Sequence, residues 1–476
     1  MTLRRLRLAR RRKALGHSQE DLAALVGVDR TTIIRWERAE TEPQPWLRRK
    51  LANHLHLTPE ELSELLEAIA DVPGRGDGHP LLSSVPLDFS LVSGHAVQVM
   101  EGFSAHDLAS RRQVLERLSI LSSAALLKPI RQWVTSLPVG HTSDSAPGQE
   151  ELGQLQAAVK LFRRWDASGV GGLKRKAVVG QLNAVAESVR DTTDASLLHK
   201  LFQIMAELAQ LAGWMAYDHG LPGVAQRYYV LALHACREAG AHALPLGVKV
   251  IGDMTQLSTA LGNYDDSVNL AGAGLYALPR SSSDLVRAEL LGLESRAYAQ
   301  LGDREARDAA RSAETCVEVW HESSDDEPAP DWLHYMNQAE VDCLAANSYT
   351  QLALQADDPA RWRAYAERAE HHTQQARRTR ANGYDRSRIL DEIRLARVRL
   401  SQREPAESVT DATSALLLAD SVRSSVVCDW FIRFHTELTV RHATEPSVDE
   451  FTGQLRDYLR RAAPAREWEI NAVAEC

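Results

Sequence analysis

Cysteines, aromatic residues and long apolar runs are all scarce in this chain of 476 residues. The five cysteines are odd in number, far apart and outside any CxxC pattern, which argues against a disulfide framework and against a zinc site. No stretch approaches the roughly 20 apolar residues of a membrane helix, and the N-terminal MTLRRLRLARRRK lacks the apolar region of a secretory signal. We therefore expect a cytoplasmic protein with no metal, no cofactor and no membrane partner.

The composition favours helices over strands. Aromatic residues make up 6% of the chain, whereas alanine and leucine recur throughout, and the apolar (44%) and charged (25%) fractions are those of a globular protein. The length allows two to four domains or one long repeat array, at about 100–200 residues per domain. We expect an all-α protein.

Charge is divided unevenly between the two ends of the chain. Residues 1–50 contain 13 Lys/Arg and 6 Asp/Glu, a net charge of +7, so the remainder must carry −16 for the total to be −9. A basic N-terminal region on an acidic body is typical of contact with nucleic acid through that region.

The first seventy residues have the spacing of a helix-turn-helix. An amphipathic helix is expected over residues 3–15, and a second begins after Ser18, whose capping pattern with Asp21 turns Leu22, Ala23 and Val26 inward. Gly27 supplies a turn, Asp29 caps a third helix, and Ile33 and Trp36 face its buried side. Fourth and fifth helices are expected over 46–55 and from Thr58 to about Ile69.

The segment SQEDLAALVGVDRTTIIRWERAETEP closely resembles the helix-turn-helix of the phage-repressor (XRE, Cro-like) family, and the resemblance covers residues 4 to about 70. It implies a five-helix lambda-repressor-like domain that binds double-stranded DNA, usually as a homodimer on a palindromic operator. By the same resemblance Gln19 contacts a phosphate, whereas Arg30, Thr31 and Arg35 face base edges. Thr32 is expected to hold the DNA backbone or a thymine methyl group.

Two further positions follow from the resemblance. Arg12 and Glu37 correspond to a structural ion pair of the family, and Ile34 departs from it because that position is usually polar. The alternative for the whole motif is a helical domain that contacts only proteins.

The sequence predicts a linker followed by helical repeats for the rest of the chain. We expect a DNA-binding domain over 1–70, a linker over 71–105, a connecting helical segment over 106–148 and repeats over 149–465. Three similar frames start 40 to 42 residues apart, at 219–233, 261–275 and 301–315. Five or six helix pairs are expected in all.

These repeats resemble tetratricopeptide repeats, with Gly213 at the small position of a first helix and Ala225, Tyr229 and Ala232 at the matching positions of the second. The resemblance implies a superhelix whose concave groove suits a peptide or a partner helix. A repressor-type head with such a body is similar to actinobacterial regulators of development or antibiotic production, and also to peptide-pheromone receptors of Gram-positive bacteria.

No segment carries a recognisable catalytic frame, so we expect no enzyme and no catalytic residues. The run RRWDASGVGGLKRK at 163–176 lacks the phosphate-loop spacing and is interpreted as a turn between helices, although a basic ligand site there stays open. Trp214, Tyr217, Tyr228 and Tyr229 are spaced either for the core or for a groove.

Two functions are compatible with these features. The first is a dimeric transcription regulator whose repeats sense a peptide, a small molecule or a protein. The alternative is a scaffold or anti-factor protein that captures partners in the groove and has a vestigial head. The sequence does not identify ligand-binding residues.

Overall fold

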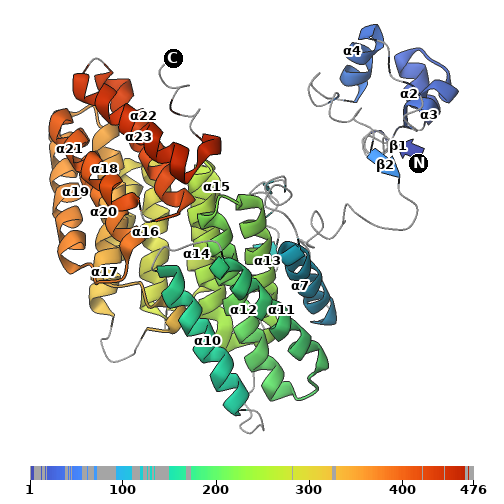
Figure 1. Ribbon diagram of the computed structural model, residues 1–476, viewed down its shortest axis with the longest axis horizontal. Helices are drawn as coiled ribbons and strands as arrows, with labels where there is room; N and C mark the ends of the chain where they lie inside the picture. The colour runs from blue at the N-terminus through green and yellow to red at the C-terminus, as the bar shows by residue number, and fades with distance from the viewer. Residues whose placement is uncertain are drawn as a thin grey trace. The chain divides into compact units, whose positions relative to one another are not determined.

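The computed structural model describes residues 19–37, 45–55, 93–109, 149–167, 173–280, 282–323, 329–420, 422–443 and 445–466, with a few shorter stretches and single residues. The chain divides into two compact units, Met1–Pro80 and Leu81–Cys476, which we call the head and the body. The division falls inside the segment 71–105 that the sequence marks as a linker. Both units are built mainly of helices (Figure 1).

The head contains the helices α2 (Gln19–Val26), α3 (Arg30–Glu37) and α4 (Pro45–His54), close to their expected bounds. Acidic residues in the first turn of α2 favour the positive end of its dipole. The expected first and fifth helices lie almost entirely outside the described residues.

The ends of the head differ from the expected helices. Residues Thr2–Arg4 form strand β1, which pairs antiparallel with strand β2 (Ile69–Asp71), so that Leu3 lies opposite Ala70. Leu3, Arg4 and Ile69 had been expected in helices. In the strand pair, the backbone groups of each three-residue segment form hydrogen bonds with the other segment. At the end of a helix, many of the same backbone groups would lack a partner.

The head has its own core. All five residues expected to point inward from the second and third helices are buried there: Leu22, Ala23, Val26, Ile33 and Trp36. They pack with Leu51, Ala52, Leu55 and Leu62. The helical period of the sequence therefore predicted the buried side of the head correctly.

The body begins earlier than expected. Helix α7 (Ser93–Ala109) starts within the expected linker, and its Val97, Met100 and Phe103 are buried in the body core. Apolar residues at this three-residue spacing give a helix one buried face, which holds it against α11 and α13.

The remaining helices of the body run almost to its end. Their bounds are α10 (Gln149–Ala167), α11 (Leu173–Asp191), α12 (Ala195–Asp218), α13 (Pro222–Ala239), α14 (Leu244–Ala260), α15 (Tyr264–Ala277), α16 (Asp284–Gln300), α17 (Ala306–Glu322), α18 (Gln338–Gln355), α19 (Pro359–Thr379), α20 (Asp385–Ser401), α21 (Pro405–Ala419), α22 (Ser425–His442) and α23 (Pro446–Ala462).

From α12 onward the described helices form six consecutive pairs, α12/α13 to α22/α23, in agreement with the expected five or six. The three frames found in the sequence each place a glycine at the turn within a pair. Gly220, Gly262 and Gly302 have φ of 74°, 81° and 97°, a left-handed conformation that glycine adopts without strain. The frames therefore mark real repeats.

The first helices of the pairs form a continuous inner row. Helices α12, α14, α16, α18, α20 and α22 pack each on the next, and α22 also contacts α12. The row thus curves back on itself. Figure 1 shows the second helices of the later pairs, such as α19 and α21, along the outside of this row.

Gly213 allows the two helices of the first pair to approach closely. A Cβ atom at this position would lie 2.6 Å from Cε1 of Tyr229 and 3.3 Å from the carbonyl oxygen of Ala225. Tyr229 and Ala225 are both fully buried. These are the positions that the repeat pattern had singled out.

Replacing Gly213 with alanine should therefore destabilise the body by about 1–3 kcal/mol, because Tyr229 must move in a tightly packed core. Gly180 in α11 is a matched control, since a Cβ atom there would meet nothing within 4 Å. Gly180→Ala should stabilise its helix by roughly 0.5–1 kcal/mol. Urea unfolding followed by circular dichroism measures both changes, and equal stability of the two variants would contradict the close approach.

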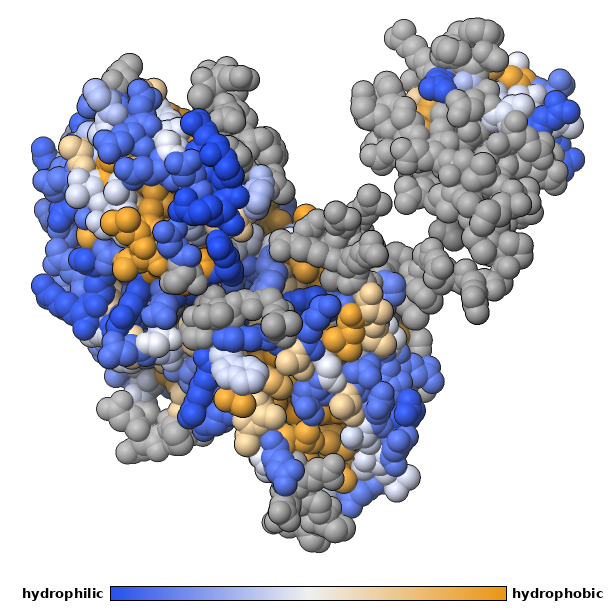
Figure 2. Space-filling view, in the orientation of Figure 1, coloured by the Kyte–Doolittle hydropathy of each residue, from blue (hydrophilic) through white to orange (hydrophobic). Residues whose placement is uncertain are grey.

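The surface of the body is largely hydrophilic in the view of Figure 2, with apolar patches between the polar side chains. Cys236, Cys316, Cys343 and Cys428 are buried free thiols, and Cys476 lies outside the described residues. No helix in the described part of the chain is long and apolar enough to cross a bilayer.

Candidate nucleic-acid interface and interior cavity

The turn between α2 and α3 fixes where α3 begins. Gly27 has φ of 83°, and the backbone N–H groups of Gly27 and Val28 both donate to the carbonyl of Ala23, at 2.9 Å each. This closes the end of α2. The carbonyl of Asp29 then accepts from the N–H of Thr32 at 2.9 Å, which opens α3 two residues after the turn.

One side of α3 is buried and the other faces solvent. Ile33 and Trp36 are in the head core, whereas Arg30, Thr31 and Arg35 are exposed. Thr31 and Arg35 are four residues apart and share a face of the helix. The structure therefore places the three predicted base-reading residues on one accessible surface, and it leaves Thr32 half-buried beside them.

Arg30 has a local partner in the preceding helix. Its Nε lies 2.8 Å from Oε1 of Glu20, and both side chains are more than half exposed, at 57% and 59%. An ion pair so open to water contributes at most about 1 kcal/mol. The guanidinium can therefore exchange Glu20 for the acceptors of a guanine at little cost.

The other predicted residues of the head have mixed outcomes. Gln19 opens α2 and is half-buried, in a position where helix N–H groups can face a phosphate. Arg12 is buried, and its Nη1 donates to the carbonyl of His17 at 2.7 Å. The side chains of Glu37 and Ile34 lie outside the described residues, so the Arg12–Glu37 pair stays a prediction.

The body encloses a cavity of about 160 Å³ within the curved row of first helices. Residues from α10, α12, α14, α16, α18, α20 and α22 line it, together with the turn around Trp332. Its walls combine apolar and aromatic side chains with six cationic ones: Arg163, Lys249, Arg296, Arg380, Arg386 and Arg394.

Lys249 on one wall is held between two carboxylates. Its Nζ lies 2.5 Å from Oδ1 of Asp253 and 3.3 Å from Oε1 of Glu289, and the hydroxyl of Tyr335 donates to Glu289. Burial alone would lower the pKa of Lys249, but the two carboxylates outweigh it and raise that pKa. Burial also raises the pKa of Glu289. The two carboxylates thus satisfy the charge of Lys249 within the cluster.

A second group of ion pairs joins the end of the inner row to its beginning. Arg386 of α20 donates to Asp166 of α10 and to Asp218 of α12, at 3.0 Å each. Ser424, which caps α22, donates to the same Asp218. These contacts span up to 220 residues of sequence and close the row around the cavity.

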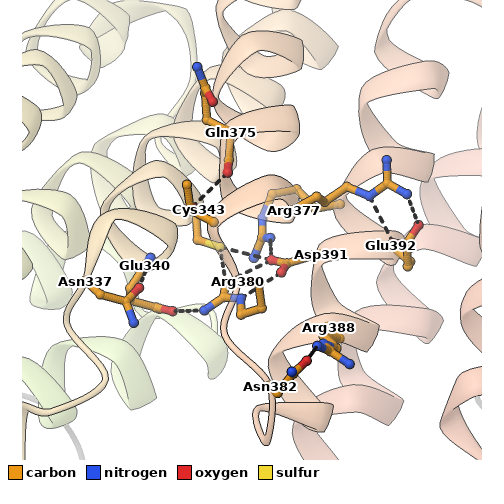
Figure 3. A network of polar contacts seen from close by, with 12 residues as sticks. Asn337, Glu340, Cys343, Gln375, Arg377, Arg380, Asn382, Arg388, Asp391 and Glu392 are labelled. Carbon is orange, nitrogen blue, oxygen red and sulfur yellow. Dashed lines mark hydrogen bonds and ion pairs between the residues drawn. The ribbon is translucent and has the colours of Figure 1, made fainter.

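A third network lies where α18, α19 and α20 meet (Figure 3). Asp391 accepts from Nε of Arg380 at 2.8 Å and from Nη1 of Arg394 at 2.6 Å. Arg380 also reaches Glu340 at 3.2 Å and the thiol of Cys343 at 2.7 Å. Burial opposes ionisation of Asp391, but the two guanidinium groups outweigh it and hold its pKa below the usual value.

Sequence patterns located only a few of the cavity residues. Trp214 had been considered for a groove and does line the cavity, whereas Tyr217, Tyr228 and Tyr229 are core residues. Within the run 163–176, residues 163–167 end α10 and residues 173–176 begin α11, so the expected turn lies outside the described residues. Arg163 lines the cavity. The described residues contain no group of three or more His, Cys, Asp or Glu suited to a metal ion.

Comparison with known protein families supports the reading of the head. Residues 8–62 match the family model described as "Helix-turn-helix". The head therefore carries a helix-turn-helix of the XRE type, which is found in DNA-binding transcription regulators. A search of curated proteins found no match to the chain.

Proposed function

We propose that the protein is a sequence-specific DNA-binding transcription regulator in which α3 is the recognition helix. The exposed Arg30, Thr31 and Arg35 on that helix, directly after a turn of helix-turn-helix geometry, support this assignment most strongly. Arginine suits the two acceptors of guanine in the major groove, and threonine suits several base edges. Gln19 then contacts a phosphate, and the basic N-terminal residues add affinity without sequence preference.

The regulator acts as a homodimer on a palindromic operator. One head covers a half-site of only a few base pairs, and two heads gain the affinity that specific binding needs. We place it in the cytoplasm and assign it a binding function without catalysis.

The body senses a signal. Its six helix pairs are of the tetratricopeptide type, an assignment that the close approach of Gly213 and Tyr229 supports. The combination of head and body corresponds to the actinobacterial type of regulator. The cavity within the inner row gives a peptide, small-molecule or protein signal a place to act.

Selection of randomised duplex DNA by the intact chain tests this function. We expect enrichment of an inverted repeat, with an affinity that falls steeply as salt rises because lysine and arginine release counterions from the phosphates. A genomic fragment from the promoter of the protein's own gene is a natural second target. Binding that depends on salt but shows no sequence preference would contradict the proposal and favour a scaffold that captures protein partners.

A further inference from the structure

One cation in the cavity differs from the others. Arg296 on α16 is only 9% exposed and lines the cavity, yet none of the described residues forms an ion pair or hydrogen bond with its guanidinium. The ring of Trp430 lies 5.3 Å from its guanidinium carbon, and the buried Tyr217 is close enough to interact with it electrostatically. The remaining five cations of the cavity wall all pair with carboxylates.

The surroundings of Arg296 increase the cost of its charge. Arg394 and Arg397 also lie over the ring of Trp430, at 5.8 and 5.3 Å, so three guanidinium groups surround one indole. Asp391 pairs with Arg394, and Glu437 pairs with both Arg397 and Arg433, so neither of these carboxylates is available to Arg296. Burial and the neighbouring arginines lower the pKa of Arg296 to about 10, so it is still charged at neutral pH.

A buried, unpaired charge is costly unless an opposite charge joins it. We propose that the cavity binds a small monoanionic carboxylate carried on a flat apolar ring, with the carboxylate paired to Arg296. The cavity wall offers such a ligand both a cation, Arg296, and aromatic surface.

The size and the wall of the cavity fit one ring. A volume of about 160 Å³ is close to that of cavities that accept benzene. Trp214, Trp332 and Tyr384 provide aromatic surface, and Leu293 and Leu344 provide aliphatic surface. Such walls favour a planar apolar group over a polar chain.

The charge balance favours a single negative charge. One guanidinium lacks a counter-ion, whereas Asp166, Asp253, Glu289 and Glu340 also line the cavity. A dianion such as a phosphate monoester would leave one charge unmatched and would face these carboxylates. A neutral ring would leave Arg296 unpaired.

Calorimetric titration of the intact chain with benzoate tests the site, with benzamide as a neutral analogue of the same shape. Because a charge-assisted hydrogen bond in a buried site is strong, benzoate should bind at least about tenfold more tightly than benzamide. Arg296→Gln should remove this preference and leave benzamide binding unchanged. Arg304→Gln is the matched control, because Arg304 is 93% exposed and outside the cavity wall.

The selectivity of the unmodified chain stands as a test even if Arg296→Gln fails to fold. Equal affinity for benzoate and benzamide, or no benzoate binding, would overturn the proposal. Benzoate affinity unchanged in a folded Arg296→Gln variant would do so as well. The role of the cavity as the signal site of a regulator rests on the proposed function. The titration contains no DNA, so it distinguishes a failure of this site from a failure of operator binding.

Discussion

Replacing Arg30 and Arg35 together with alanine should abolish sequence-specific DNA binding by the intact chain while both units stay folded. Both side chains are exposed, and within the described part of the head only Arg30 forms an ion pair, the weak one to Glu20. Each base-reading arginine contributes about 1–3 kcal/mol, so the double variant should lose roughly 30-fold to more than 10⁴-fold in operator affinity. Fluorescence anisotropy with the selected operator measures this loss.

Specific and non-specific binding must be compared to interpret that result. The double variant should keep most of its salt-dependent affinity for unrelated DNA, because contacts to phosphates do not depend on the base-reading side chains. Arg311→Ala, at a 70% exposed position of the body, serves as the control and should bind the operator normally. Retention of full operator affinity by the double variant would show that α3 is not the recognition helix.

The head could be predicted in detail because its signals are local. The capping residues and Gly27 set the bounds of α2 and α3 within two or three residues of the expected ones, and apolar spacing identified the buried side chains. The strands β1 and β2 escaped prediction because they pair residues nearly seventy positions apart. No sequence pattern within either segment indicates which distant segment it pairs with.

The repeats of the body could be predicted from the sequence, but its cavity could not. Turn glycines at 40 and 42 residue intervals predicted the repeats, since each turn needs a left-handed residue. The cavity could not be predicted, because it depends on how far the row of helices curves. Contacts such as Arg386 with Asp166 bring α20 to α10, and a lone arginine such as Arg296 looks like any solvated charge in the sequence.

Replacing Asp391 with asparagine should destabilise the body more than any other single change considered, by about 3–5 kcal/mol. The carboxylate of Asp391 is 2% exposed and is shared by Arg380 and Arg394, which are themselves nearly inaccessible. A neutral amide cannot offset two buried guanidinium groups, and its NH₂ group faces donors. Urea unfolding followed by tryptophan fluorescence reports this change, since eight of the ten tryptophans lie in the body.

Asp303→Asn is a matched control, because Asp303 also pairs with an arginine, at 2.6 Å, but is 64% exposed. It should cost less than about 1 kcal/mol. Because the pKa of Asp391 is lowered in the folded state from its ordinary 3.8, its ionised form stabilises the body at every pH above that value. This contribution is lost as the pH falls further, so the difference between the unmodified chain and Asp391→Asn should be constant near neutral pH and shrink below about pH 4. A difference as small as that of Asp303→Asn would mean that the network contributes little to the joint between α18, α19 and α20.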